Sequence, residues 1–296
     1  MALANLAGAQ NVDNVPTSPQ NSTSNPGNGM APAADPTLGA AESQVIAAQI
    51  NQALVSALTG QNAVLNAKAS DLLAHVDVVA PVIASVMHRP GITLAQQWQV
   101  TKVIRRGGLG GELLDSLASP EPPTRAAAAQ LCGALRMAES VAWVSDLLSD
   151  PDEKVRIAAA RALGRTGGRR AVDALMGAVE AFPPHRLALA IAHGASDIDL
   201  DGLLRSGGSA KTTVVVVLAC GLRADALRFP RLVAMARDRN GPSEVRAAAC
   251  RALGMIGDRA AAGVLRNLGL DPDSAVSEAA THALRRYHPG VQRRQT

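Results

Sequence analysis

Apolar residues recur every three or four positions along much of this chain, which is the period of one face of an α-helix. In residues 43–57, Val45, Ile46, Ile50 and Leu54 follow this spacing. The spacing predicts a helix there and a second helix over about 67–87, which Pro81 either kinks or divides. The folded part of the chain is therefore predicted to begin with helices.

The same pattern then returns in blocks of about thirty residues. Residues 150–164 (DPDEKVRIAAARALG) and 241–254 (GPSEVRAAACRALG) agree at nearly every position from Val155-Arg156 onward, and they lie three thirty-residue periods apart. Weaker copies occupy 124–133, 186–194, 213–221 and 276–284, and a further copy covers roughly 94–118. A fixed period of this length is typical of a solenoid. We predict about seven units.

Each unit has the composition of a pair of short helices. A turn containing Pro with Asp or Ser begins the first helix, because Pro suits the first helical turn and a short polar side chain accepts from free amides. Alanines allow neighbouring backbones to approach closely, and Gly164, Gly194 or Gly254 is expected to end the helix in a left-handed conformation. A second helix follows, as in 171–179 and 261–268. Two such helices bury their apolar faces only by stacking on neighbouring units.

The pattern Asp-Pro-x-x-x-Val-Arg-x-x-Ala-Ala-x-Ala-Leu-Gly, complete in 150–164 and partial in 241–254 and 271–284, resembles HEAT repeats, in particular short bacterial and phycobilisome-lyase-type repeats. The resemblance implies an all-α fold, a right-handed α-solenoid of about seven helix pairs over residues 90–296. Residues 41–89 would form two capping helices or a self-association segment. In similar repeats one arginine tethers the turn of its own or an adjacent unit; here the matching residues are Arg125, Arg156, Arg186 and Arg246.

Residues 1–40 have a different character. They are rich in Asn, Ser, Pro and Gly, so they cannot bury enough apolar area to offset chain entropy, and we predict a disordered tail. The start has neither the basic residues nor the apolar run of a Sec signal, and the longest uncharged apolar stretch, 78–88, is too short to span a bilayer. We expect a cytoplasmic protein. The alternative is a bacterial effector exported by a non-Sec route, because such a tail resembles the amino-terminal signal of type III secretion substrates.

Catalytic chemistry is not visible in the residue pattern. The chain contains no phosphate loop, no Gly-x-Ser-x-Gly elbow, no Cys-x-x-Cys pair, and no His-Glu dipeptide of the kind that HEAT-type di-iron hydroxylases use. His185 and His193 are eight residues apart and could share a helix face, but no acid stands at ligand spacing. Two Phe, two Trp and one Tyr leave little to stack on a flat pigment, so a lyase-like or chromophore-binding HEAT protein is only an alternative. We predict a non-enzymatic protein with no cofactor and no metal.

The charge pattern favours a protein partner. Arginine outnumbers lysine 25 to 4, which is typical of GC-rich bacterial genomes, and residues 91–296 carry 27 basic and 20 acidic groups, a formal charge of +7. Acidic and basic residues alternate closely, so nucleic acid is not expected. Because second helices line the inner curve of HEAT solenoids, the resemblance favours a scaffold or adaptor that contacts an acidic partner there. Candidate contacts are Asp146, Arg228, Arg231 and Arg266, together with the densest basic cluster, Arg161, Arg165, Arg169 and Arg170.

Overall fold

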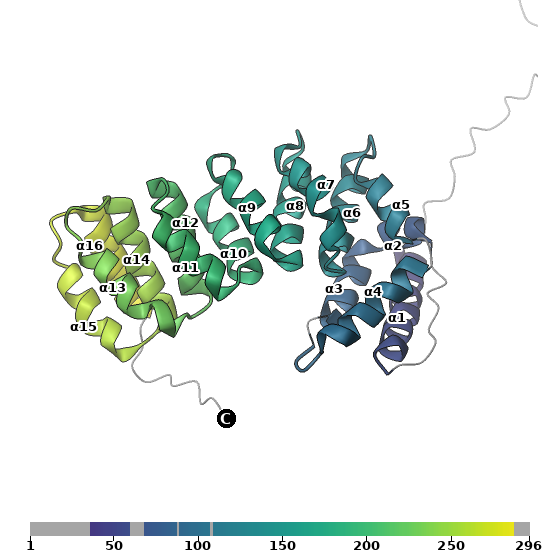
Figure 1. The fold of residues 1–296 in the computed structure, drawn as a ribbon, viewed down its shortest axis with the longest axis horizontal. Helices are drawn as coiled ribbons and strands as arrows, with labels where there is room; N and C mark the ends of the chain where they lie inside the picture. Colours follow the sequence, from purple (N-terminus) through teal and green to yellow (C-terminus); the bar gives the residue numbers. More distant parts are fainter. Residues whose placement is uncertain (1–35, 60–67, 88, 107–108, 287–296) are drawn as a thin grey trace, which may run out of the picture.

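The computed structural model describes residues 36–59, 68–87, 89–106 and 109–286 of this chain. Within these ranges every regular element is a helix, and the helices stack along the long axis of the molecule (Figure 1). The solenoid expected from the repeats is therefore confirmed. The predicted disordered tail and export signal lie outside the described residues as far as residue 35.

Three helices precede the repeats: α1 (Pro36–Leu58), α2 (Ala69–Ala74) and α3 (Val76–Met87). The division expected at Pro81 falls instead at His75, and Pro81 lies inside α3. Helix α3 packs on α1 and on α6 of the repeats, burying Ile83 and Val86. This packing agrees with a capping role, while self-association stays a prediction.

Seven units follow, six as helix pairs and the last as one helix within the described residues. The pairs are α4 (Leu94–Arg106) with α5 (Leu109–Ser116), α6 (Pro122–Ala134) with α7 (Val141–Asp146), α8 (Glu153–Thr166) with α9 (Arg169–Gly177), α10 (Pro184–Gly194) with α11 (Asp197–Ser206), α12 (Ala210–Leu222) with α13 (Phe229–Arg237), and α14 (Ser243–Ile256) with α15 (Arg259–Leu268). Helix α16 (Ser274–Arg286) begins the seventh unit. From α6 onward, each first helix packs on the first helix of the next unit.

Small residues set how closely these first helices approach. A Cβ built on Gly133 would lie 2.5 Å from the Cα of Ala162 in the next unit, and one on Gly221 would lie 2.6 Å from the Cα of Ala252. Carbon atoms ordinarily meet at 3.5–4.0 Å. These positions therefore accept only glycine while the helices keep their spacing.

The expectation that Gly164 and Gly254 end their helices is wrong. Both lie inside α8 and α14, where an added Cβ would meet Ala190 and Ala283 of the next unit at 2.8 and 2.7 Å. The left-handed glycines come three residues later, at Gly167 with φ +68° and Gly257 with φ +71°. Close packing between units, rather than chain reversal, explains the conserved spacing of these glycines within the repeat.

The cysteines are part of this core. Cys132, Cys220 and Cys250 are all fully buried. Burial raises the pKa of the Cys132 thiol to about 12 and those of the Cys220 and Cys250 thiols to about 11. A neutral, buried thiol packs as a small apolar group.

Candidate functional site

Arginine tethers hold the turns of regular units together. Arg125 donates to the backbone oxygens of Ser119 and Pro120 in its own turn at 2.9 and 3.0 Å. The same guanidinium donates two bonds, of 2.8 and 2.9 Å, to the carboxylate of Asp150 in the next unit. These bonds lower the pKa of Asp150 below its ordinary value. Arg156 likewise donates to the backbone oxygen of Asp150 at 2.8 Å.

The arginine–aspartate link between units occurs at two junctions among the described residues. Arg246 pairs with Asp271, which lies 25 residues later, as Asp150 lies 25 residues after Arg125. The corresponding position after Arg156 is Ala181, whose side chain has no acceptor. The position after Arg186 is Lys211, and Thr213 replaces the arginine of the following unit, so those junctions lack this link as well.

Arg186 makes a different contact at the junction of α8 and α10. Its ion pair within the described residues is with Glu153 of α8, at 3.5 Å, and not with its own turn. The tether prediction is thus confirmed for Arg125, Arg156 and Arg246, whereas Arg186 reaches the first residue of α8 in the adjacent unit rather than its own turn. Arg186 also lines a groove between the two helices.

Helix α10 presents an exposed face beside α8. His185, Leu189 and His193 lie one turn apart on this face and are exposed, with Leu189 at 45%. The opposite side of the helix carries Leu187 and Ile191, which are both fully buried. Helix α10 approaches α8 closely at Gly164, where an added Cβ would lie 2.8 Å from the Cα of Ala190.

A groove with a volume of about 570 Å³ lies between α8 and α10, and we call it the basic groove. Its apolar lining comes from both helices and from the segment before α10. Among the described residues, its polar lining contains three arginines and two histidines and no carboxylate. The lining residues are Ile157, Ala160, Arg161, Arg165, Phe182, His185, Arg186, Leu189, Ala190 and His193.

The charges of the basic groove are mostly uncompensated. Among the described residues, Arg161 and Arg165 form no ion pair, and Glu153 reaches only Arg186. Arg161 is exposed and Arg165 is half-buried. The groove thus presents a positive rim over an apolar floor, which suits an anionic ligand with an apolar face.

The structure separates the predicted basic cluster. Arg161 and Arg165 reach the basic groove, whereas Arg169 forms an ion pair with Asp173 at 2.9 Å on α9. Arg170 is exposed at the start of α9. Sequence reasoning placed His185 and His193 on one helix face but missed Leu189, which lies between them and could have been found from the same four-residue spacing.

The candidates on second helices lie apart from this groove. Asp146 and Arg266 are exposed on α7 and α15. Arg231, also exposed, donates to the backbone oxygen of Leu204 in the preceding unit at 2.7 Å. None of the three lines the basic groove.

The exposure expected for Arg228 is wrong. Only 5% of this residue is exposed, and its guanidinium pairs with Asp201 at 3.0 Å, with Asp197 at 3.4 Å and with Asp225. It also donates to the backbone oxygen of Asp197 at 2.7 Å. Arg228 links two units from the inside and is not available to a partner.

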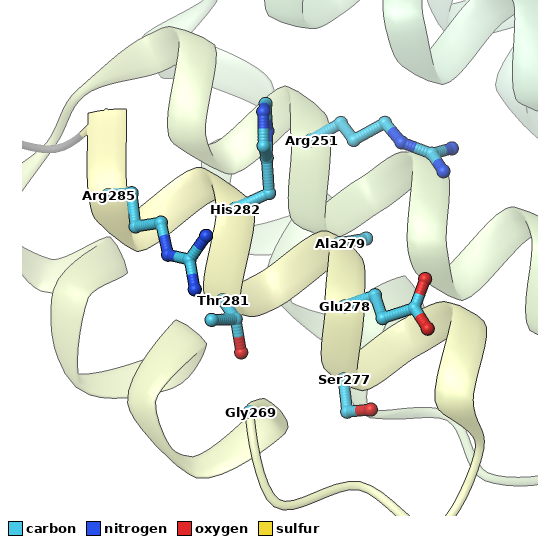
Figure 2. Close-up of a pocket in the computed structure, with 8 residues that line it drawn as sticks. All are labelled: Arg251, Gly269, Ser277, Glu278, Ala279, Thr281, His282 and Arg285. Atoms are coloured by element: carbon cyan, nitrogen blue, oxygen red, sulfur yellow. The ribbon is translucent and has the colours of Figure 1, made fainter.

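A second cavity, of about 560 Å³, lies between α14 and α16. Figure 2 shows Glu278, His282 and Arg285 on α16 with Arg251 on the neighbouring helix. Here a carboxylate stands among the cations, so the lining is of mixed charge. The basic groove, whose lining carries positive charge alone, is therefore the more selective of the two cavities for an anionic ligand.

Two further findings limit the chemistry within the described ranges. These residues contain no group of three or more His, Cys, Asp or Glu side chains placed to hold a metal ion. None of their helices is both long and apolar enough to cross a membrane.

Comparison with known proteins gives matches to the fold. A family model for HEAT repeats matches residues 112–194 and 202–285. No curated protein matches the chain significantly. Among solved structures, the chain is similar to human deoxyhypusine hydroxylase in complex with glycerol, with a TM-score of 0.32 and 19% identity over 86% of this chain and 99% of that one. It is also similar to an engineered protein, with a TM-score of 0.30 and 21% identity over 80% of this chain and 96% of that one.

Proposed function

This chain belongs to the HEAT-repeat family, and on that premise we propose that it is a non-catalytic scaffold that binds a protein partner through the basic groove between α8 and α10. One observation carries the proposal. Among the described residues, the groove combines an apolar floor with three arginines, two histidines and no carboxylate in its lining.

Packing energetics support a binding role for this junction. Leu189 is 45% exposed on the side of α10 that lines the groove. An exposed leucine beside arginines is typical of the centre of an interface, where arginine is enriched and apolar side chains enter pockets. Covering Leu189 and its neighbours would remove this apolar surface from water.

The lining favours a protein over a flat pigment. Of the described residues that line the basic groove, Phe182 is the one Phe, Tyr or Trp, and only 5% of it is exposed. A planar ring system would therefore have little ring surface to stack on besides two imidazoles, whereas carboxylates of a polypeptide would meet guanidinium groups that form bidentate hydrogen bonds with them. The proposed partner accordingly has an acidic surface.

Site-specific crosslinking tests this function. A photoreactive benzoylphenylalanine placed at Leu189 of the full chain, in cells of the source organism, is expected to give a crosslinked polypeptide. The same residue placed in an R161E/R165E background should give none, and one placed at Arg266 serves as the surface control. A Leu189 crosslink that is unchanged in the charge-reversed background, or no crosslinked polypeptide at all, contradicts the proposal.

A further inference from the structure

We propose that the occupant of the basic groove is an acidic amphipathic α-helix of the partner, lying along α8 and α10. This inference rests on the proposed function and specifies the partner's chemistry. Three properties of the groove point to a helix: the spacing of its cations, the form of its apolar floor and the absence of a lid.

The cations of the groove repeat at the spacing of a helical turn. Arg161 and Arg165 are four residues apart on α8, which places them one turn apart on one side of the groove. Two carboxylates four residues apart on a partner helix have the same spacing. Such a helix can pair both guanidinium groups at once, and Arg186 on α10 offers a third contact.

The apolar floor follows the same period. Ile157 lies one turn before Arg161 on α8, and Leu189 lies between His185 and His193 on α10. From Ile157 to Arg165 the wall is about 12 Å long at 1.5 Å per residue. That length matches two turns of a partner helix, with apolar residues at i and i+3 or i+4 over Phe182 and Leu189.

The groove is built as an open trough. Its lining comes from two helices and from Phe182 in the segment between α9 and α10, and no other element in the described part of the chain contributes a residue. Small-molecule sites enclose most of the surface of their ligand. A trough between two helices leaves the outer side of its occupant uncovered, which a helix of a larger protein tolerates because its own protein covers that side.

Charge complementarity selects among helices. Among the described residues, Arg161 and Arg165 form no ion pair and the lining holds no carboxylate, so a helix with a neutral or basic face would leave both guanidinium charges unpaired. Residues 1–20 of this chain contain Asp13 as their one acidic residue, so this segment lacks the paired carboxylates. The occupant is therefore assigned to a partner rather than to this chain's own start.

The probe for the test is a fluorescein-labelled peptide of 18 residues designed as a helix, with glutamates at i and i+4 flanking a stripe of leucines. Two control peptides carry lysines in place of the glutamates, or the same composition with the stripe scrambled. Fluorescence anisotropy with the full chain measures binding. Circular dichroism establishes that each variant is folded.

The acidic peptide should bind the wild type, and R161E/R165E should weaken binding at least tenfold. The lysine peptide should bind R161E/R165E more tightly than it binds the wild type, a reversal that a merely structural role of these arginines would not produce. Leu189→Asp should weaken the acidic peptide, and Arg266→Glu on α15 should change its affinity less than twofold.

Equal binding of the scrambled peptide, or of a peptide containing residues 1–20 of this chain, would overturn the proposal. So would an affinity that R161E/R165E leaves unchanged. If Leu189 crosslinks to a protein in cells while no designed helix binds, the scaffold function stands and the helical occupant is wrong. If neither occurs, both fail.

Discussion

Replacing Gly221 by alanine tests the close packing of first helices. Gly221 is in the last turn of α12, and a Cβ there would lie 2.6 Å from Cα and 2.9 Å from Cβ of Ala252 in α14. The Sδ of Met255 would lie 3.2 Å away. The methionine can adjust, but a backbone atom of a packed helix cannot.

Two opposing effects decide the magnitude. Alanine is favoured over glycine inside a helix by at most about 1 kcal/mol, and less in the last turn. Against this, the helices must separate by roughly 1 Å to restore an ordinary carbon contact. Overpacking of this kind costs about 1–3 kcal/mol, and the upper part of that range applies because backbone is involved. We expect Gly221→Ala to lower the free energy of unfolding by about 2 kcal/mol.

A matched control lies in α15. Gly263 is inside that helix, and a Cβ there would meet nothing within 4 Å. Gly263→Ala should therefore raise the stability by up to about 1 kcal/mol, because only the helix preference remains. The same substitution thus has opposite signs at two helical positions.

Urea unfolding of the full chain, followed by circular dichroism at 222 nm, measures both variants. The midpoint should move to lower urea for Gly221→Ala and to higher urea for Gly263→Ala, and the slope reports whether the units still unfold together. Equal or greater stability of Gly221→Ala would refute the close-packing argument. Loss of stability in Gly263→Ala would show that the helix preference has been misjudged.

Three further results are expected. The hydrogen bonds from Arg125 lower the pKa of Asp150, so the contribution of this carboxylate to folding stability is present above the unfolded pKa of about 3.9 and is lost as pH falls through the folded value. Asp150→Asn should therefore lower the urea midpoint at pH 7. A difference in midpoint that is as large at pH 3 would contradict this. Arg228→Ala should lower the free energy of unfolding in urea by about 3 kcal/mol, because it leaves the buried Asp225 unpaired. Arg266→Ala, the exposed control, should change it by less than about 0.5 kcal/mol. Similar losses in both variants would show that the buried ion pairs of Arg228 are unimportant for stability. Ellman's reagent at pH 8 should label Cys132, Cys220 and Cys250 only after unfolding, and rapid labelling of the folded chain would contradict their burial. Because burial raises the pKa values of these thiols in the folded chain, the free energy of unfolding should fall as pH rises above about 8.5, where the thiols of the unfolded chain ionise.

The basic groove could be predicted only in part. Arg161 and Arg165 stood out as members of a dense basic cluster, and the spacing of His185 and His193 indicated a shared face. Their convergence depends on how α8 and α10 pack against each other, which no single-unit pattern records. Arg228 shows the opposite case. The sequence predicts a surface arginine on a second helix, but the structure buries this residue and pairs it with three aspartates.

The thirty-residue period by itself determined that this chain stacks helix pairs and about how many units there are. Those features depend on contacts between neighbouring first helices that recur along the stack, so a repeat reveals them. Tertiary structure alone decided that Gly164 and Gly254 are contact points, and that α10 exposes Leu189 beside three arginines. The physical reason is that the contact points of two packed helices follow from the fit of both surfaces, which the sequence of one unit does not specify.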